Sequence, residues 1–172
     1  EGFKDQRFFY NLGWLYYRKN RFDDALGAWQ KIYAENPFHP VVSFAMGNAW
    51  LHLKKDVLAS AEYDKVIRYY EAISKRLPAV DPEVKRHQNV IGNLVNSYNN
   101  IGVAWELRSQ RTGDAEFEKK ALLSFWKARE LADRMNRVGF EYPENNIRYI
   151  LHRDANAGLR RGLAIAPERG GR

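Results

Sequence analysis

Hydrophobic residues recur along this chain at the three- and four-residue intervals of amphipathic helices. Tyr10, Trp14 and Tyr17 are spaced i, i+4, i+7, so they share one face of a helix. A second set with the same spacing begins 34 residues later, at Phe44. Turn-forming residues separate the periodic segments, and the pattern therefore predicts helices joined by short connections.

Turn and breaker residues set the expected helix ends. Residues 20–25 are typical of a turn followed by an acidic helix start, which the helix dipole favours. Pro37 ends the second helix, because proline lacks the backbone donor and restrains the residue before it. Further along, we expect helices over residues 61–77, 82–108, 115–137 and 144–160.

A spacing of small and aromatic residues repeats along the first half of the chain. Gly13 is followed after 12 residues by an alanine and after four more by Trp29. Gly47 lies 34 residues after Gly13 and is followed at the same intervals by an alanine and by Tyr63. A looser third copy begins at Gly102 and has seven additional residues between glycine and alanine. Small residues allow two antiparallel helices to approach closely, so each copy predicts one helix pair.

These intervals resemble the tetratricopeptide repeat family of helical repeat proteins. The residues that carry the resemblance in the first copy are Leu12, Gly13, Tyr16, Ala25, Trp29 and Pro37. The sequence departs from the family at Ile32 and Val66, where the family usually has alanine. The resemblance implies an all-α fold, a right-handed α-solenoid of about three helix pairs with a C-terminal capping helix.

The same resemblance gives an expected domain organisation. The repeat array spans residues 1–137, and a capping helix with a basic flexible tail spans residues 138–172. Within the array, we expect repeats at about 6–39, 40–77 and 82–137, the last two with insertions.

Composition narrows the classes of function. The chain has 172 residues, of which 45% are hydrophobic, and a formal net charge of +7. It has no cysteine, which excludes disulfides, thiol nucleophiles and cysteine-ligated metals and is compatible with cytoplasm or periplasm. No apolar run approaches the ~18 residues that span a bilayer. Because the sequence begins at Glu1 rather than Met, we expect a fragment of a longer protein.

The sequence offers little that points to catalysis. Its four histidines are scattered without metal-ligand spacing, and phosphate-loop, dinucleotide and hydrolase motifs are absent. The acidic pairs lie at expected helix starts, where a role at the helix dipole suffices. We therefore predict a protein that is not an enzyme and that needs no metal, cofactor or small-molecule substrate.

In the family that the chain resembles, the first helix of each pair lines a concave groove. Carried over position by position, the resemblance predicts a partner-binding groove, which Val41 extends by one turn. The predicted groove residues are Arg7, Tyr10, Trp14, Tyr17, Phe44, Asn48, Leu51, His52, Asn96, Asn99, Asn100 and Val103.

Two parts of this groove have alternative interpretations. The aromatic residues either anchor apolar side chains of a partner or belong to the core, packed against a neighbouring helix. An amide stripe follows at helical spacing, and it either hydrogen-bonds a peptide backbone or forms a solvated polar face. The stripe consists of Asn89, Asn93, Asn96 and Asn100.

The sequence therefore predicts a non-catalytic scaffold that binds a partner protein or peptide in its groove, within a larger bacterial secretion, envelope or motility assembly. One alternative is an adaptor for nucleic acid or an anionic surface, since residues 148–172 hold six arginines against one Asp and one Glu. An RNA-binding signature is absent. Another alternative is a structural spacer within a longer solenoid, with self-association through the repeat edges.

Overall fold

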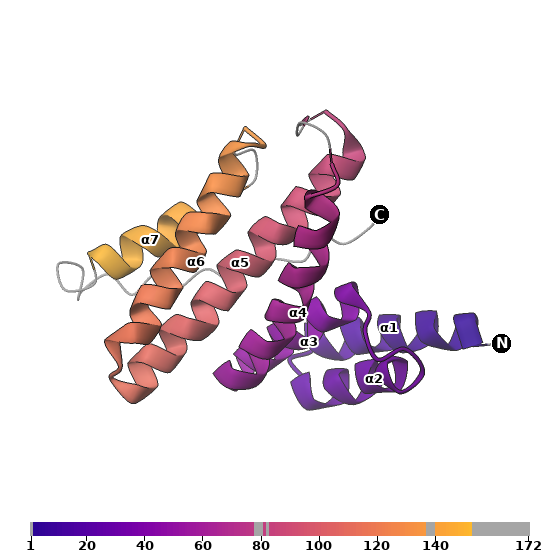
Figure 1. The fold of residues 1–172 in the computed structure, drawn as a ribbon. Coiled ribbons are helices and arrows are strands. Elements are labelled where there is room, and N and C mark those ends of the chain that lie inside the picture. Colours follow the sequence, from indigo (N-terminus) through magenta and orange to yellow (C-terminus); the bar gives the residue numbers. More distant parts are fainter. Residues whose placement is uncertain (1, 78–80, 82, 137–139, 153–172) are drawn as a thin grey trace.

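The computed structural model describes residues 2–77, 81, 83–136 and 140–152 (Figure 1). Over these residues the chain forms seven α-helices and no strand. The helices are α1 (Gly2–Arg18), α2 (Phe22–Glu35), α3 (Pro40–His52), α4 (Asp56–Ser74), α5 (Lys85–Thr112), α6 (Ala115–Asp133) and α7 (Tyr142–Leu151). The predictions of an all-α fold and of a helical repeat are confirmed.

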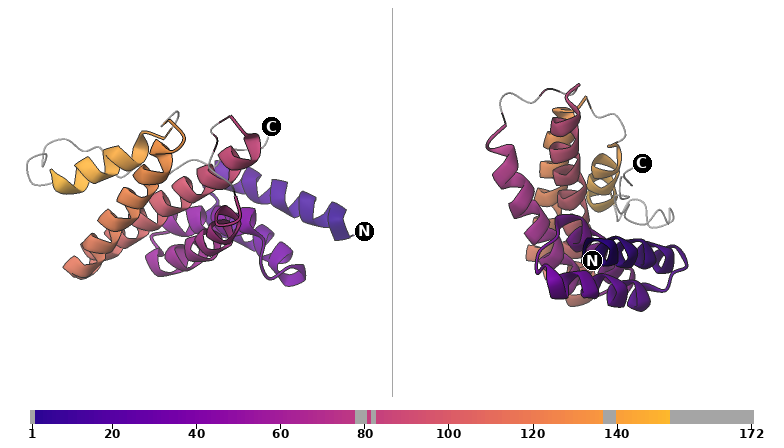
Figure 2. Two further views of the ribbon diagram at one scale, coloured as in Figure 1. Left: turned by 45° about the horizontal axis from the view of Figure 1, so that its top comes forward. Right: turned by 90° about the vertical axis from the view of Figure 1, so that its right-hand side faces the viewer.

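The helices follow one another as hairpins that pack side by side. α1 pairs with α2, α3 with α4, and α5 with α6, and each pair also contacts the next one. The longest hairpin, α5–α6, crosses the molecule diagonally in Figure 1, and α7 packs against α6. Two further views show α1, α2 and α3 gathered at one end of the molecule and α6 and α7 at the other (Figure 2).

The same glycine–aromatic contact closes each of the three hairpins. A Cβ atom added at the repeat glycine would lie 2.1 Å from the ring in the first hairpin and 2.7 Å from it in the second and third. These distances are too short for any side chain, so only glycine allows the ring to seat against the facing helix. The pairs are Gly13 with Trp29, Gly47 with Tyr63, and Gly102 with Phe125.

The seven additional residues of the third repeat lengthen its helices. α5 continues ten residues beyond Gly102, whereas α1 ends five residues beyond its repeat glycine. At the turn, Gly113 adopts the left-handed conformation with φ 74°, and its N–H donates to the Ser109 carbonyl. The Asp114 carboxylate then accepts the Glu116 N–H at 2.9 Å and caps α6.

Several helix ends differ from the expected ones. α4 ends at Ser74, three residues before the expected end, and α6 ends at Asp133. α5 begins at Lys85 instead of residue 82, because the Asp81 carboxylate accepts the Glu83 N–H at 2.8 Å and holds this segment in a turn.

The last expected helix, over 144–160, is also shifted. α7 begins two residues earlier, at Tyr142, and ends at Leu151. Residues 153–160, with the rest of the basic tail, lie outside the described residues.

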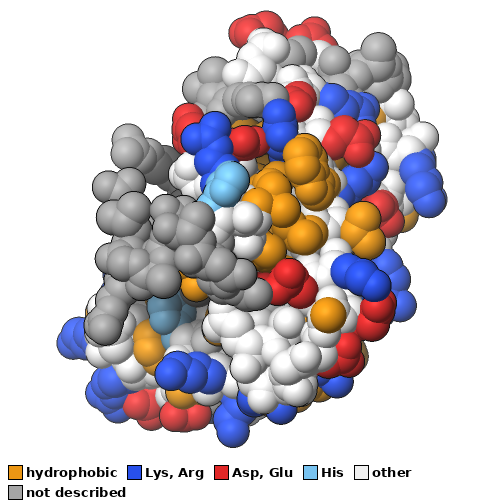
Figure 3. Space-filling view, turned by 90° about the vertical axis from the view of Figure 1, so that its left-hand side faces the viewer, with side chains coloured by type: hydrophobic (Ala, Val, Ile, Leu, Met, Phe, Trp, Pro, Cys, Tyr) orange, Lys and Arg blue, Asp and Glu red, His pale blue; other side chains and the backbone are white. Residues whose placement is uncertain are grey.

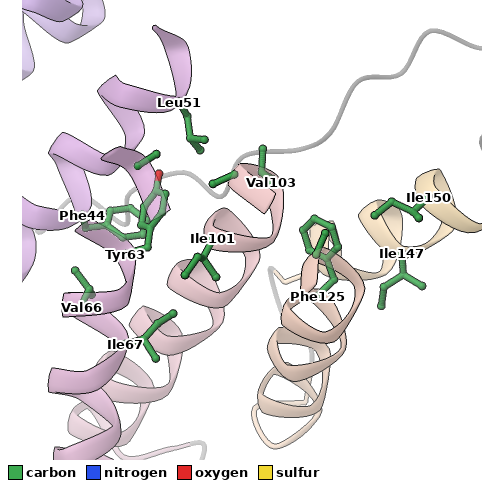
Figure 4. Packing of buried hydrophobic residues seen from close by; sticks show 13 residues of the cluster. Phe44, Leu51, Tyr63, Val66, Ile67, Ile101, Val103, Phe125, Ile147 and Ile150 are labelled. Atoms are coloured by element: carbon green, nitrogen blue, oxygen red, sulfur yellow. The ribbon is translucent and has the colours of Figure 1, made fainter. Parts of the chain in front are cut away.

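The buried hydrophobic residues form a continuous core along the array. One cluster runs from α3 to α7 and includes Phe44, Tyr63, Ile101, Phe125 and Ile147 (Figure 4). A second cluster joins α1 and α2 to α3. The aromatic ring of each hairpin contact lies at the centre of its cluster, since all three rings are 0% exposed.

Candidate functional site

A hollow of about 670 Å³ opens between the first helices of the three pairs. α1, α3 and α5 line it with side chains near their N-terminal ends, and α2 and α4 contribute to its floor. Its lining residues are Gln6, Arg7, Tyr10, Ile32, His39, Pro40, Val41, Val42, Phe44, Val66, Tyr70, Asn89 and Asn93.

The hollow contains part of the predicted groove. Arg7, Tyr10 and Phe44 line it, and so does Val41, on the turn before Phe44. Asn89 and Asn93, from the expected amide stripe, form part of the α5 wall. The structure therefore brings the N-terminal part of the predicted groove together around one cavity.

Sequence reasoning missed other lining residues, notably Gln6, His39 and Tyr70. Gln6 lies at the position seven residues before the repeat glycine, and Pro40 takes the same place in the second repeat. That correspondence was available in the sequence. Tyr70 comes from the second helix of a pair, and no spacing rule for groove residues includes it.

The hollow has an apolar floor and a polar rim. Ile32, Val42 and Val66 are 1–2% exposed and form its floor. Arg7 is the charged residue among the lining side chains, and it is exposed. His39 stands at the N-terminal end of α3, where burial lowers the pKa of its imidazole, so the ring is neutral at pH 7.

Two rim amides are held by hydrogen bonds within the chain. The Gln6 amide donates to the Glu35 carboxylate at 3.0 Å, and the Asn93 amide donates to the Asn89 carbonyl at 2.8 Å. These bonds orient the two side chains beside the apolar floor. The arrangement suits a peptide that buries an apolar side chain and presents polar groups to the rim.

The aromatic residues of the predicted groove divide between the hollow and the core. Trp14 packs against Trp29 and Tyr17, with ring centroids 5.2 and 5.1 Å apart. Tyr17 also meets Phe22 and His52 edge-on at 5.3 and 5.4 Å. The core interpretation therefore describes Trp14 and Tyr17, whereas Tyr10 lines the hollow.

The asparagines nearer the C-terminal half of the groove form a buried network. The Asn48 side-chain oxygen accepts from the Tyr63 hydroxyl at 2.6 Å and from the Asn100 amide at 2.9 Å. The Asn99 amide donates to Asn100 at 3.1 Å, and the Asn146 amide donates to Asn99 at 2.8 Å. This chain of amides joins α3, α4, α5 and α7.

The remaining predicted residues are mostly buried as well. Asn96 is 3% exposed and accepts a hydrogen bond from the Tyr142 hydroxyl. Leu51 and Val103 belong to the hydrophobic core. For Asn96 and Asn100 the interpretation as a solvated face is wrong, because both amides are buried between helices.

His52 is exposed on the side of α3 that meets the first hairpin. Its ring stacks on Phe22, with centroids 4.5 Å apart and planes within 3°. Burial of the ring face lowers the pKa of the imidazole. His52 thus joins the second repeat to the turn of the first.

The side of the molecule formed by α6 and α7 has a different surface. Hydrophobic side chains gather there among charged ones (Figure 3). The large hydrophobic residues that these two helices expose are Leu123, Trp126 and Leu151. Arg129 lies over the Trp126 ring at 5.0 Å and pairs with Glu144 of α7 at 3.1 Å.

Among the described residues, no group of three or more histidine, aspartate or glutamate side chains is placed to hold a metal ion. None of the helices in this part of the chain is both long and apolar enough to cross a membrane.

Comparison with known proteins agrees with the first helix pair. Residues 6–39 match the family model described as tetratricopeptide repeat. This is the segment in which the sequence carries the resemblance most completely. No curated protein matches the chain. Repeats of this family usually mediate protein–protein interactions and are generally non-catalytic, which indicates an interaction scaffold.

Proposed function

We propose that this chain, which carries a tetratricopeptide repeat, is a non-catalytic scaffold that binds a segment of a partner protein in the 670 Å³ hollow. In this role the chain is a module of a larger assembly. The observation that carries the proposal is the hollow itself, where the first helices of all three pairs place an apolar floor beside a polar rim.

The chemistry of the hollow defines the ligand. An apolar side chain of the bound segment packs on Val41, Phe44 and Tyr70, and an acidic group pairs with Arg7. Tyr10 provides a large, rigid contact surface beside both. The ligand is thus a peptide segment that combines apolar and acidic residues.

The domain organisation is proposed on related grounds. α7 packs on α6, as the first helix of a pair packs on the preceding pair. This packing supports a division into a repeat array over residues 1–137 and a capping segment that begins at residue 138.

Selection of peptides from a displayed library on the full chain tests the binding proposal. Calorimetry of the selected peptides then compares wild type with Tyr10→Ala and Arg7→Ala. We expect Tyr10→Ala to weaken binding by about 2 kcal/mol, roughly thirtyfold in Kd. Arg7→Ala selectively weakens the acidic peptides, and this loss shrinks at high salt.

Leu123→Asp is the matched control, because Leu123 is 70% exposed on α6, away from the hollow. This variant is expected to bind like wild type. Circular dichroism confirms that each variant is folded. Peptides that bind all variants equally, or a library that yields no specific peptide, would contradict the proposal.

A further inference from the structure

α1 has an outward face that no described helix covers. Phe8 and Leu15 lie on this face, two helical turns apart, and they are 60% and 50% exposed. The N-terminal half of α1 projects at the edge of the molecule (Figures 1 and 2). The hollow lies on a different face of the same helix, at Gln6 and Tyr10.

The repeat register shows what covers the equivalent face elsewhere. Counted from the repeat glycine, Phe8 and Leu15 correspond to Val42 and Ala49 in α3. Val42 is 1% exposed and Ala49 is 0% exposed, and both belong to the cluster in which α2 packs against α3. In the second hairpin, therefore, the preceding helix buries the positions that α1 leaves exposed.

The third hairpin repeats this arrangement. Its equivalent residues are Ser97 and Ala104 of α5, and both are 0% exposed. α5 packs against α4, the helix that precedes it in the array. Two interfaces in this molecule thus show that the face is built to receive a helix.

Charge defines the helix that fits. The helices that cover the equivalent faces are acidic: α2 has three acidic residues and one basic residue, and α4 has four acidic and two basic. The helices that receive them are neutral or basic. α3 has no Asp, Glu, Lys or Arg, and α5 has four basic residues and one acidic residue. α1 follows the basic pattern, with three basic residues and one acidic residue.

We propose that the outward face of α1 is a second docking site, which receives an acidic amphipathic helix of a partner protein. The helix lies against α1 as α2 lies against α3. Its apolar side packs on Phe8 and Leu15, and its acidic flanks face Arg18 and Lys19, both exposed at the C-terminal end of α1. A second copy of this chain fits less well, since its own α1 is basic and α7 covers the far end of its array.

The test uses the full chain and a helix that this molecule already employs for the purpose. The probe is a fluorescent peptide with the sequence of α2, residues 22–35, held helical by a hydrocarbon staple. A control peptide replaces Asp23, Asp24 and Glu35 by lysine. Fluorescence anisotropy measures the affinity of both peptides for wild type, Phe8→Asp/Leu15→Asp, Tyr10→Ala and Leu123→Asp.

We expect wild type to bind the acidic peptide saturably and about tenfold or more tightly than the lysine peptide. Phe8→Asp/Leu15→Asp should weaken this binding by about tenfold or more, because it places charge in the apolar contact. Tyr10→Ala and Leu123→Asp should leave it unchanged, which separates this site from the hollow and from the surface of α6. A loss of probe binding with Phe8→Asp/Leu15→Asp alone supports the second site even if the hollow binds no peptide.

Several results would overturn the proposal. These are an acidic peptide that does not bind, equal affinity for both peptides, and binding that Tyr10→Ala removes but Phe8→Asp/Leu15→Asp does not. Sedimentation equilibrium adds one more. A mass that rises from 20.1 kDa towards twice that value, and that Phe8→Asp/Leu15→Asp returns to 20.1 kDa, would assign the face to a second copy.

Discussion

The first and third hairpins are built on one contact but stand in different surroundings. In α1–α2, Trp29 fills the space at Gly13, and in α5–α6, Phe125 fills the space at Gly102. α1 contacts α2 but leaves its outward face exposed, whereas α5 lies between α4 and α6 and also bonds to α7 through Asn99. The local repeat thus determines how a hairpin closes, and the neighbours determine how much of it is buried.

Removal of the central rings tests this comparison most strongly. We expect Phe125→Ala to lower the free energy of unfolding by about 3–5 kcal/mol, since it empties a fully buried site in the cluster that joins α3 to α7. Trp29→Ala should cost a similar amount but act locally, because α1 has neighbours on one side only. Urea unfolding gives the total, and hydrogen exchange shows where protection is lost.

Trp126→Ala is the control for both variants, because Trp126 follows Phe125 directly and is 46% exposed. It should change stability by less than about 0.5 kcal/mol. If Trp29→Ala removes protection throughout α5 and α6, the two hairpins unfold as one unit, and the contrast between edge and centre is wrong.

The amide network gives the next largest effect, and it belongs to the third hairpin alone. Asn100→Ala removes the donor to Asn48 and the acceptor for Asn99 within a buried site, so we expect a loss of about 1–3 kcal/mol. Asn89→Ala, at an exposed position of the same helix, should be near neutral. Equal costs for the two variants in urea unfolding would show that the network adds no stability.

The sequence predicted the repeated contact but not this network. Gly13, Gly47 and Gly102 and their aromatic partners lie at fixed intervals within one hairpin, so local spacing was sufficient to pair them. Asn146 lies 47 residues from Asn99, outside any repeat interval, and its hydrogen bond depends on how α7 packs. Amides at helical spacing look the same in a sequence whether they face a ligand, solvent or another helix.

The site was predicted to a similar extent. Arg7, Tyr10 and Phe44 follow from the register of the first helices, and the structure places all three at the hollow. The wall formed by Asn89 and Asn93 depends on how far α5 extends before its repeat glycine. That length depends on the turn at Asp81, which no helical periodicity records.

Alkaline pH provides a third test, directed at the centre of the array. Burial raises the pKa of Tyr63 well above its ordinary value, so the folded state keeps a proton that the unfolded state loses above about pH 10. The raised pKa stabilises the fold below pH 10, and that stability is lost as the pH rises. We expect the free energy of unfolding to fall by about 1.4 kcal/mol per pH unit from this group.

Urea unfolding between pH 8 and pH 11 measures this slope. Tyr63→Phe should be less stable at pH 8, because it removes the hydrogen bond to Asn48, but its stability should decline less above pH 10. An unchanged decline would show that other groups, such as Tyr98, whose pKa is also raised by burial, dominate the alkaline response.

The hairpin turns provide the smallest effect and extend the comparison to the second hairpin. Asn20 and Lys54 lie 34 residues apart at equivalent turns, and both have φ 57°. The left-handed conformation costs an ordinary side chain about 1–2 kcal/mol, but asparagine tolerates it better, and glycine adopts it freely. Lys54→Gly should therefore stabilise the chain by about 0.5–1 kcal/mol after the entropic cost of glycine in the unfolded state. Asn20→Gly, the matched change, should gain less, and a larger gain there in urea unfolding would mean that the two turns are not equivalent.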